Sequence, residues 1–426
     1  MAEKDGGLLG DSVRRKIAEL KEVDILVGIP SYNNARTIPH VVRAVNAGLA
    51  KYYPDSKCVL VNSDGGSKDG TPDLVSHTEV GNLDMILVDH PVYLVSKIVT
   101  PYHGIPGKGS AFRTIFKIAR ELNAKACCVV DSDLRSITPE WIELLLDPIV
   151  DKGFEFVAPL YSRHKFDGTI TNSIVYPMIR AMYGKRIRQP IGGEFGFSGK
   201  LAAHYLTKDV WESDVARYGI DIWMTTTAIG DGFKVCQSYL GAKIHDAKDP
   251  GADLTAMYIQ VVSSLYTFLE SYYNIWKKIK NSENIPTFGF KFEVGLEPVN
   301  VNIERMVNAF KLGIEALVPF LEKIITEQEL KELQNLAKED IKKFHFSDDL
   351  WVKLVYRYAL AFHHRIWSTA QLMKSMIPLY LGRTASFVIE NLDSTSEEVE
   401  AKIEMLCEQY ERLKQLLIEN WEKQKI

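Results

Sequence analysis

The chain has 426 residues, of which 46% are hydrophobic and 25% are charged, as is typical of a globular protein with two or three domains. Its 51 Lys and Arg residues nearly balance its 55 Asp and Glu residues, which leaves a net charge of −4. This balance excludes a general attraction to nucleic acid or to anionic lipid. We therefore expect functional basic residues to be local and directed at one ligand.

The cysteine pattern and the absence of long apolar runs indicate the compartment. The five cysteines are odd in number, and none belongs to a CxxC pair. Four of them lie in apolar, strand-like runs, so we expect buried free thiols in a reducing compartment: Cys58, Cys127, Cys128 and Cys236. No secretory signal is recognisable in the first 20 residues, and no uncharged apolar run reaches the roughly 18 residues of a membrane span. These features predict a soluble, cytoplasmic protein.

Strand-like and helix-like segments alternate through the first 250 residues. Residues 1–20 are expected to form an N-terminal helical segment. Short apolar runs then predict strands at 24–29, 57–61, 124–130, 156–161 and 234–241. Helices are predicted at 37–50, 111–122 and 139–146, and Thr71-Pro72-Asp73 is typical of an N-cap followed by a first helical turn. The alternation predicts an α/β domain over residues 21–250, with a doubly wound and mostly parallel sheet.

The remaining residues, 251–426, have a different character. Helical periodicity dominates from Asp253 onward, with breaks near 281–302, Ser347 and Asp393. We expect an all-helical C-terminal domain that packs on itself, on the sheet domain or on another subunit. We also expect a homodimer. The last helix, predicted over 396–425, is charged and amphipathic, which favours a solvated helix or a helix–helix contact over membrane attachment.

Two carboxylates directly follow one of the predicted buried strands, in Asp131-Ser132-Asp133. In an extended segment, side chains two residues apart share one face. A hard divalent cation accepts such oxygens and keeps positions open for diphosphate and water. The alternative is a solvated turn or a helix cap. Because parallel sheets bind ligands beyond the carboxyl ends of their strands, we expect this segment to share a crevice with residues 30–34 and 63–66.

Further polar segments have the composition of ligand-binding loops. His245, in the polar run GAKIHDAKDP, can be a metal ligand or a structural histidine. Gly107-Lys108-Gly109 precedes a predicted helix and suits a phosphate, although the Walker spacing is absent and an ordinary turn is the alternative. Asp64 can accept from a nucleobase or merely form its turn. Gly192 and Gly193 leave space for a sugar ring, whose hydroxyls Glu194 would hold.

Basic residues gather in two segments. Arg163, His164 and Lys165 precede the polar Thr169, Thr171 and Asn172, and a second group contains Lys185, Arg186 and Arg188. Arginine can bind a carboxylate or a phosphate through two parallel hydrogen bonds, so these segments suit a small anionic acceptor. The alternative is ordinary surface charge.

The motifs together resemble those of a known enzyme group. The ordered set is IPSYNNARTI, NSDGGSKDGT, PGKGSA, VVDSDLRS, RQPIGGEF, YGIDIWMT and GAKIHDAKD. Over roughly residues 24–249 it is similar to the retaining glucosyl-3-phosphoglycerate synthases and the related glucosylglycerate and mannosylglycerate synthases, which have a GT-A fold. RQPIGGEF with the later YGIDI and GxKxH distinguishes this group from generic family-two transferases. The QxxRW sequence of many processive inverting members is absent.

The resemblance implies a role for each of these segments. Mg²⁺ or Mn²⁺ would be bound by Asp133 and His245, and Asp131 would contact the ribose. The catalytic residues are expected to be Asp131, Asp133, Glu194 and Asp221, the last two holding the donor sugar. The nucleotide-sugar would also contact Pro30, Tyr32, Asp64, Gly107, Lys108, Ser132 and Gly193. The acceptor would contact Arg163, Lys165, Thr169, Thr171, Asn172 and Arg188. One departure is that Tyr32-Asn33-Asn34 lacks the Glu that the family often has there.

The implied reaction is transfer of glucose, with retention, from UDP-glucose to 3-phosphoglycerate or D-glycerate. GDP-glucose and GDP-mannose are also compatible donors, the latter as in a mannosylglycerate synthase. No carboxylate is marked as a nucleophile, so we favour same-face attack over a covalent intermediate. The residues are also compatible with an inverting family-two-like transferase with a glycan acceptor, with a nucleotidyltransferase, and with a scaffold that binds sugar nucleotides without catalysis.

Overall fold

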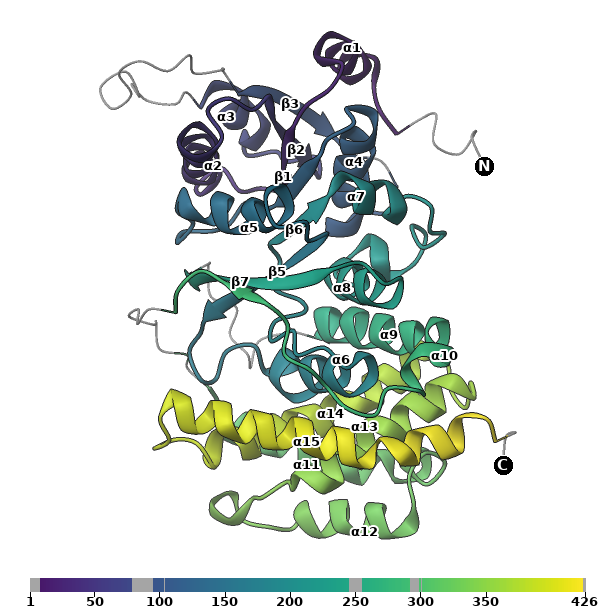
Figure 1. Ribbon diagram of the computed structural model, residues 1–426. Helices are drawn as coiled ribbons and strands as arrows, with labels where there is room; N and C mark the ends of the chain where they lie inside the picture. Colours follow the sequence, from purple (N-terminus) through teal and green to yellow (C-terminus); the bar gives the residue numbers. More distant parts are fainter. Residues whose placement is uncertain are drawn as a thin grey trace. The chain divides into compact units, whose positions relative to one another are not determined.

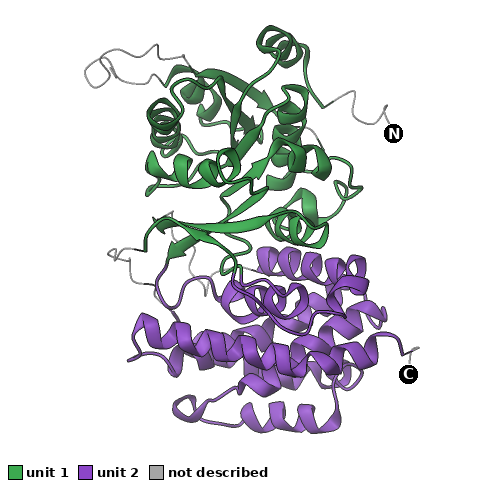
Figure 2. Ribbon diagram, viewed as in Figure 1, with its two compact units in different colours: residues 1–162, 187–247, 285–295 green, residues 163–186, 248–284, 296–426 purple. Residues whose placement is uncertain are grey.

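The computed structural model describes residues 8–78, 95–102, 104–244, 255–291, 299 and 301–423 (Figure 1). The chain divides into two compact units (Figure 2). Unit 1 comprises residues 1–162, 187–247 and 285–295, and unit 2 comprises residues 163–186, 248–284 and 296–426. The units thus differ from the expected 21–250 and 251–426 division. The chain leaves unit 1 after Ser162 and returns to it at Ile187.

Unit 1 is built around a sheet whose order, among the described strands, is β3-β2-β1-β4-β6-β5-β7-β8. All neighbours are parallel except β6, which runs antiparallel to β4 and β5. The sheet is therefore mostly parallel, as the alternation of segments predicts. The strands are β1 (Ile25–Ser31), β2 (Cys58–Asp64), β3 (Ser96–Pro101), β4 (Ala126–Val129), β5 (Phe156–Ser162), β6 (Phe195–Ser198), β7 (Val235–Ala242) and β8 (Thr287–Phe288).

Helices cover the sheet of unit 1 on both faces. Every residue of β1, β2 and β4 is buried, as expected of apolar strands covered on both sides. Ile25, Val27 and Ile29 share a core with α2 and α5, whereas Gly28 lies against Ile115 of α4. The helices of unit 1 are α1 (Asp11–Leu20), α2 (Ile38–Tyr52), α3 (Thr71–His77), α4 (Lys108–Glu121), α5 (Glu140–Val150), α7 (Gly199–Tyr205) and α8 (Ile220–Gly230), with a 3₁₀ turn, η3 (Asp214–Ala216).

The start of α3 differs by one residue from the expected one. Its N-cap is Gly70, in the left-handed region at φ +84°, and Thr71 is the first helical residue. The Asp69 carboxylate accepts hydrogen bonds from the Thr71 amide (3.1 Å) and hydroxyl (2.6 Å). A carboxylate two residues before the helix therefore does the capping that the sequence assigned to the threonine.

Unit 2 is helical, as expected for the C-terminal part of the chain. Its elements are the π-helical turn η2 (Thr171–Val175), α6 (Tyr176–Tyr183), α9 (Thr255–Ser271), α10 (Tyr273–Trp276), α11 (Ile303–Leu321), α12 (Glu327–Leu336), η4 (Ile341–Lys343), α13 (Asp348–His363), α14 (Thr369–Ile389) and α15 (Ser396–Trp421). None of the helices in the described part of the chain is both long and apolar enough to span a membrane. All five cysteines of the chain are buried free thiols, as predicted for the four in strand-like runs.

The segment 163–186 belongs to unit 2 because α6 is packed inside it. Every residue of α6 is buried. Arg180 forms ion pairs with Glu404 and Glu411 of α15, the latter at 2.7 Å. Lys414, also on α15, donates to the Ala181 carbonyl at 2.8 Å. These long-range contacts hold α6 to the last helix of the chain.

Candidate active site

The loops after β1 and β2 lie side by side, because the two strands are parallel and Ser31 pairs with Asp64. The Asp64 carboxylate accepts from the Ser31 hydroxyl (2.8 Å), the Gly66 amide (2.8 Å), and the amide and hydroxyl of Ser67 (2.7 and 2.6 Å). Each oxygen thus accepts two hydrogen bonds within the loop. Asp64 therefore holds its own turn, and a base contact would come in addition. Pro30 is buried in β1.

The Asp131-Ser132-Asp133 turn is tied to the loop after β1. The Asn34 side-chain oxygen accepts from the Ser132 hydroxyl at 2.8 Å and from the Tyr32 amide at 3.0 Å. The Thr37 hydroxyl donates to the Ser132 carbonyl at 2.7 Å. Asn34 thus joins the two loops. The three segments share one edge of the sheet, as the strand-end rule predicts.

Two tyrosine rings flank Gly65 at this edge. Tyr32 is 62% exposed. A Cβ atom at Gly65 would lie 3.0 Å from the Tyr32 ring and 3.1 Å from the Tyr102 hydroxyl. Tyr102 accepts in turn from the Gly107 amide at 2.9 Å. An exposed ring beside a glycine turn offers a flat surface on which a planar base can stack.

Lys108, the first residue of α4, lies between two carboxylates. Its Nζ is 2.8 Å from Asp131 Oδ1 and 3.3 Å from Asp221 Oδ1. Burial disfavours the charged lysine, but the Asp131 and Asp221 carboxylates outweigh it and raise the Lys108 pKa. Burial likewise disfavours ionised Asp131, but Lys108 and Lys243 hold the pKa of Asp131 below its usual value. The burial of Asp221 raises its pKa, with Lys108 opposing.

Lys243 forms the second cationic centre of the site. Its Nζ lies 2.8 Å from both Glu194 oxygens, 2.8 Å from the Gly192 carbonyl and 3.1 Å from Asp131 Oδ2. Glu194 has no exposed surface and also accepts from the Tyr161 hydroxyl. Burial raises the pKa of Glu194 to about 7, although Lys243 lowers it. The five charged groups form one connected network, which we call the charge network: Lys108, Asp131, Glu194, Asp221 and Lys243.

Sequence reasoning missed Lys243, although it lies in the GAKIH run that drew attention to His245. Lys243 directly follows β7, which pairs with a strand on each side. This position could have indicated that the lysine belongs to the site. A lysine at the carboxyl end of a buried strand has few acceptors except the loops of neighbouring strands. Lys243 reaches those of β4 and β6.

Gly193 is a glycine for two reasons. Its φ of +96° is in the region that L side chains rarely adopt, and a Cβ there would lie 2.5 Å from Asp131 Oδ2 and 2.8 Å from Lys243 Nζ. Any side chain would therefore push apart an ion pair of the charge network. The glycine allows Asp131 and Lys243 to meet beside Glu194.

Gly107 and Gly109 permit a close approach of protein backbone. A Cβ at Gly107 would lie 2.5 Å from the Ala216 carbonyl oxygen, and one at Gly109 would lie 1.8 Å from that of Val215. The 3₁₀ turn η3 thus packs directly on the start of α4. This packing within unit 1 requires both glycines, and the phosphate contact suggested by the sequence stays a prediction.

Of the two expected metal ligands, Asp133 lies within the described residues. Asp133 is half-buried, and its side chain has no hydrogen-bond or ion-pair partner among the described residues. His245 lies outside the described residues. No group of three or more His, Cys, Asp or Glu side chains within that part of the chain could hold a metal ion. A carboxylate that no described residue engages, two residues from Asp131 of the charge network, fits a hard divalent cation.

The expected acceptor residues lie in unit 2, apart from Arg188, which belongs to unit 1. Lys165 donates to the carbonyls of Asn391, Leu392 and Ser394, each at 2.8 Å. The Lys165 ammonium group is therefore already bound by three carbonyl oxygens in the segment that follows α14. Thr171 is buried in η2.

The other polar residues of this segment also have partners within unit 2. The Thr169 hydroxyl lies 2.5 Å from that of Tyr380, and the Asn172 amide donates to the Asp167 carbonyl at 3.0 Å. Arg163 is 3.6 Å from the Asp167 carboxylate. In the second basic group, Lys185 pairs with Glu283 and Arg186 donates to Ser282.

An α/β unit with a DxD segment and a cationic helix start at the carboxyl edge of its sheet is typical of nucleotide-sugar transferases. The chain belongs to the mannosylglycerate synthase family: the family's GT domain matches residues 40–267. It is a GT-A glycosyltransferase related to the mannosylglycerate synthases, as the motifs implied. No curated protein matches the chain significantly.

Solved structures of glucosyl-3-phosphoglycerate synthase from Mycobacterium tuberculosis are similar to the chain. One, with Mn²⁺, UDP and glucosyl-3-phosphoglycerate, is 22% identical, covering 59% of this chain and 83% of its own, with a TM-score of 0.43. A second, with Mg²⁺ and UDP, is 21% identical over 59% and 82%, with a TM-score of 0.43. A third, with Mn²⁺, UDP-glucose and phosphoglyceric acid, is 22% identical over 59% and 83%, with a TM-score of 0.42.

Proposed function

We propose that this protein is a retaining glycosyltransferase that transfers glucose from UDP-glucose to 3-phosphoglycerate or D-glycerate. The observation that carries the proposal is the charge network at the carboxyl edge of the sheet, beside the loops after β1 and β2. Two half-buried lysines there lie within 3.3 Å of three carboxylates. Such a cluster suits a ligand with both anionic and hydroxyl groups, which describes a sugar diphosphate.

The departing diphosphate determines what the cations do. As the glycosidic bond breaks, negative charge develops on the diphosphate oxygens, and Lys108 at the N-terminus of α4 stabilises it. Asp133, with His245, would hold a divalent cation, which supplies Lewis-acid stabilisation of the same oxygens. Tyr32 stacks on the base, and Asp131 orients the ribose.

Glu194 and Asp221 accept hydrogen bonds from the donor sugar. Lys243 and Tyr161 both bond to Glu194, so its carboxylate is fixed before the sugar arrives. Such preorganisation removes a reorganisation cost from the reaction. Lys243 is thus a positioning residue that acts through Glu194 and Asp131.

The pairing of the carboxylates supports same-face attack. Every carboxylate of the charge network is bonded to a lysine, and none stands alone as a nucleophile. In a same-face reaction the acceptor hydroxyl forms the new bond on the side that the diphosphate leaves. The departing diphosphate then takes the hydroxyl proton, so no protein nucleophile is needed.

A transfer assay with the protein tests the proposal directly. We would offer UDP-glucose, GDP-glucose and GDP-mannose, each with 3-phosphoglycerate, D-glycerate and neutral sugars, and identify products by mass spectrometry. The expected result is an α-linked product from UDP-glucose and one of the two acids, with its configuration determined by NMR. Transfer only to a neutral glycan, or a β-linked product, would refute the proposal.

A second candidate is a mannosylglycerate-type synthase that uses GDP-mannose, which the family match favours. Calorimetric measurement of UDP and GDP binding distinguishes the two candidate functions. The first candidate requires that UDP bind more tightly than GDP, whereas tight GDP binding without measurable UDP binding favours the second.

A further inference from the structure

Unit 2 contains a cavity of about 180 Å³. Since one water takes about 30 Å³ of liquid, this volume holds roughly six waters or one small organic molecule. Its lining comes from η2, the start of α13, the end of α14 and the first turns of α15. Thr169 and Asn172, two residues that the sequence suggested for an acceptor, are among the lining residues.

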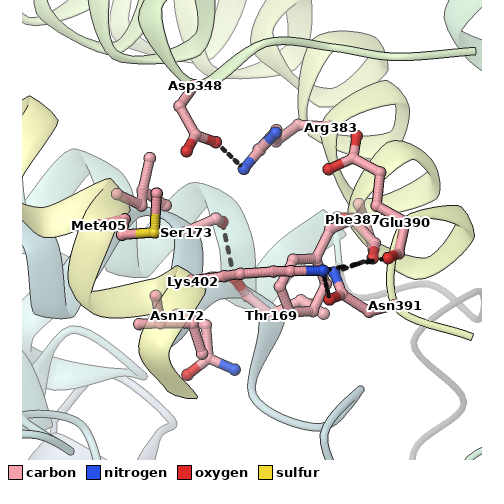
Figure 3. A pocket seen from close by; sticks show the side chains of 13 residues that line it. Thr169, Asn172, Ser173, Asp348, Arg383, Phe387, Glu390, Asn391, Lys402 and Met405 are labelled. Atoms are coloured by element: carbon pink, nitrogen blue, oxygen red, sulfur yellow. Dashed lines mark hydrogen bonds and ion pairs between the residues drawn. The ribbon is translucent and has the colours of Figure 1, made fainter. Parts of the chain in front are cut away.

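The charged groups around the cavity balance. Arg383 pairs with Asp348, and Lys402 donates to the backbone carbonyl of Glu390 at 3.2 Å. The Glu390 carboxylate accepts from the Ser386 hydroxyl and lies 2.8 Å from His345 Nδ1. Figure 3 shows Arg383 and Asp348 on one side of the cavity and Lys402 reaching toward Asn391 on the other. An anionic ligand would meet two carboxylates as well as two cations. The lining therefore favours an uncharged ligand.

A buried arginine forms part of the cavity wall. Arg383 is 5% exposed, and its Nη1 donates to the Phe346 carbonyl at 2.5 Å. Its Nε has no hydrogen-bond partner among the described residues. The Arg383 side chain is thus a fixed part of the cavity wall.

An apolar side completes the lining. Phe387, Ile403 and Leu406 contribute an aromatic ring and aliphatic groups, and Met405, 61% exposed, lies at the rim. Donors and acceptors on one side and an apolar surface on the other suit a molecule with several hydroxyls and a C–H face. Each hydroxyl both donates and accepts, which matches a lining that mixes Arg, Lys, Asp, Glu and Asn.

We propose that this cavity binds a small uncharged polyhydroxylated molecule, of the size of a monosaccharide. All residues that line the cavity belong to unit 2, whereas those of the charge network belong to unit 1. The proposal goes beyond the proposed transfer reaction and does not depend on it.

Saturation-transfer NMR on the full-length protein tests the proposal, with glucose, mannose and glycerol as probes and 3-phosphoglycerate as the anionic comparison. We expect a monosaccharide to bind and 3-phosphoglycerate not to compete with it. Met405→Trp, which fills the rim, and Lys402→Met, which removes a donor, should each weaken binding at least tenfold. The matched controls are Leu312→Trp, at a position 67% exposed on α11, and the exposed Lys374→Met on α14, and neither should change binding.

Three outcomes would contradict the proposal that the cavity binds a sugar. The first is no binding of any uncharged probe to the wild-type protein. The second is binding that both cavity variants leave unchanged. The third is binding that Asp221→Asn abolishes, because the sugar would then occupy unit 1. Failure of the transfer assay with intact, cavity-dependent sugar binding would affect only the proposed function.

Discussion

Lys243 joins Asp131 to Glu194, and this makes it the most informative single residue of the site. Replacing it by methionine keeps the length of the side chain and removes the charge. We expect Lys243→Met to lower kcat at least about 100-fold, as when a preorganised electrostatic contact is lost. The Glu194 pKa should rise further without the ammonium, so the pH profile of the residual activity should shift upward. Steady-state kinetics over a range of pH measures both effects.

The exposed Lys234, just before β7, gives the matched control Lys234→Met, which should leave kcat and the pH profile unchanged. A Lys243→Met enzyme with normal kcat would contradict a positioning role. A lower kcat with an unshifted profile would indicate that Lys243 only supports the fold.

Glu194 should make stability depend on pH. Burial raises its pKa from the usual 4.5 to about 7, so the folded protein binds more protons than the unfolded chain between these values. The free energy of unfolding therefore falls as the pH rises through this window. Glu194→Gln cannot titrate and should flatten the dependence in part, since the raised pKa of Asp221 acts in the same direction. Urea unfolding at about pH 5 and about pH 8 measures this.

For comparison, Glu339→Gln at an exposed position should keep the wild-type slope. If Glu194→Gln retains the full wild-type slope, the Glu194 carboxyl is not the group that titrates there.

Asp133 is expected to bind the metal without supporting the fold, because it has no side-chain partner among the described residues. Asp133→Ala should reduce turnover by at least about 1,000-fold, since the metal stabilises the leaving group, and should leave the Tm unchanged. Activity against Mn²⁺ concentration and thermal unfolding are the two measurements. Asp151→Ala, at an exposed position after α5, is the control. Full wild-type activity in excess chelator would rule out the metal.

At the scale of elements, the start of α4 depends on η3. A Cβ at Gly109 would lie 1.8 Å from the Val215 carbonyl oxygen, so Gly109→Ala must push η3 and α4 apart. We expect a loss of about 1–3 kcal/mol in the free energy of unfolding, as for other overpacked sites. The KM for the donor should also rise, because Lys108 is the neighbouring residue. Gly10→Ala, with nothing within 4 Å of its Cβ, is the control in urea unfolding and kinetics. Equal stability of the two variants would contradict the packing.

The sequence predicted the elements whose patterns are strong. The apolar runs of β1, β2, β4, β5 and β7 were all found, because a strand buried on both faces is almost continuously apolar. In contrast, β3 alternates less clearly, and only two of its residues are buried. The four-residue β6 begins at Phe195, the last residue of the RQPIGGEF motif, and a run so short gives no clear strand pattern. The crevice was predictable from the ends of the strands. In contrast, the contacts of Lys243 and the packing of η3 on α4 depend on which loops meet in the fold.

At the scale of the whole molecule, the chain crosses from the sheet unit to the helical unit and back within its first half. Periodicity alone could not predict this, since a short helix such as α6 has the same pattern whichever partner covers it. Its partners Glu404 and Glu411 lie 224 and 231 residues away along the chain. The expected boundary near residue 250 therefore followed composition, whereas the compact units follow packing.

A chain cut after residue 250 should not fold cooperatively. It would keep α6, whose every residue is buried, but lose α13, α14 and α15. The exposed apolar surface and the unpaired Arg180 should make the fragment aggregate or bind a hydrophobic dye. Size-exclusion chromatography and urea unfolding, with the full-length chain as reference, test this. A monodisperse fragment with a sharp unfolding transition would show that the first 250 residues are a self-sufficient domain.

The long separation of Arg180 from Glu404 has a consequence for biosynthesis. The ribosome adds about 5–20 residues per second, so the 224 residues between them take roughly 10–45 s to emerge. During that time the nascent α6 has no partner, although the strands on either side of it are already made. The α6 segment therefore cannot complete its packing until α15 has been synthesised. Chaperones that shield apolar nascent segments should bind the chain between residues 163 and 186.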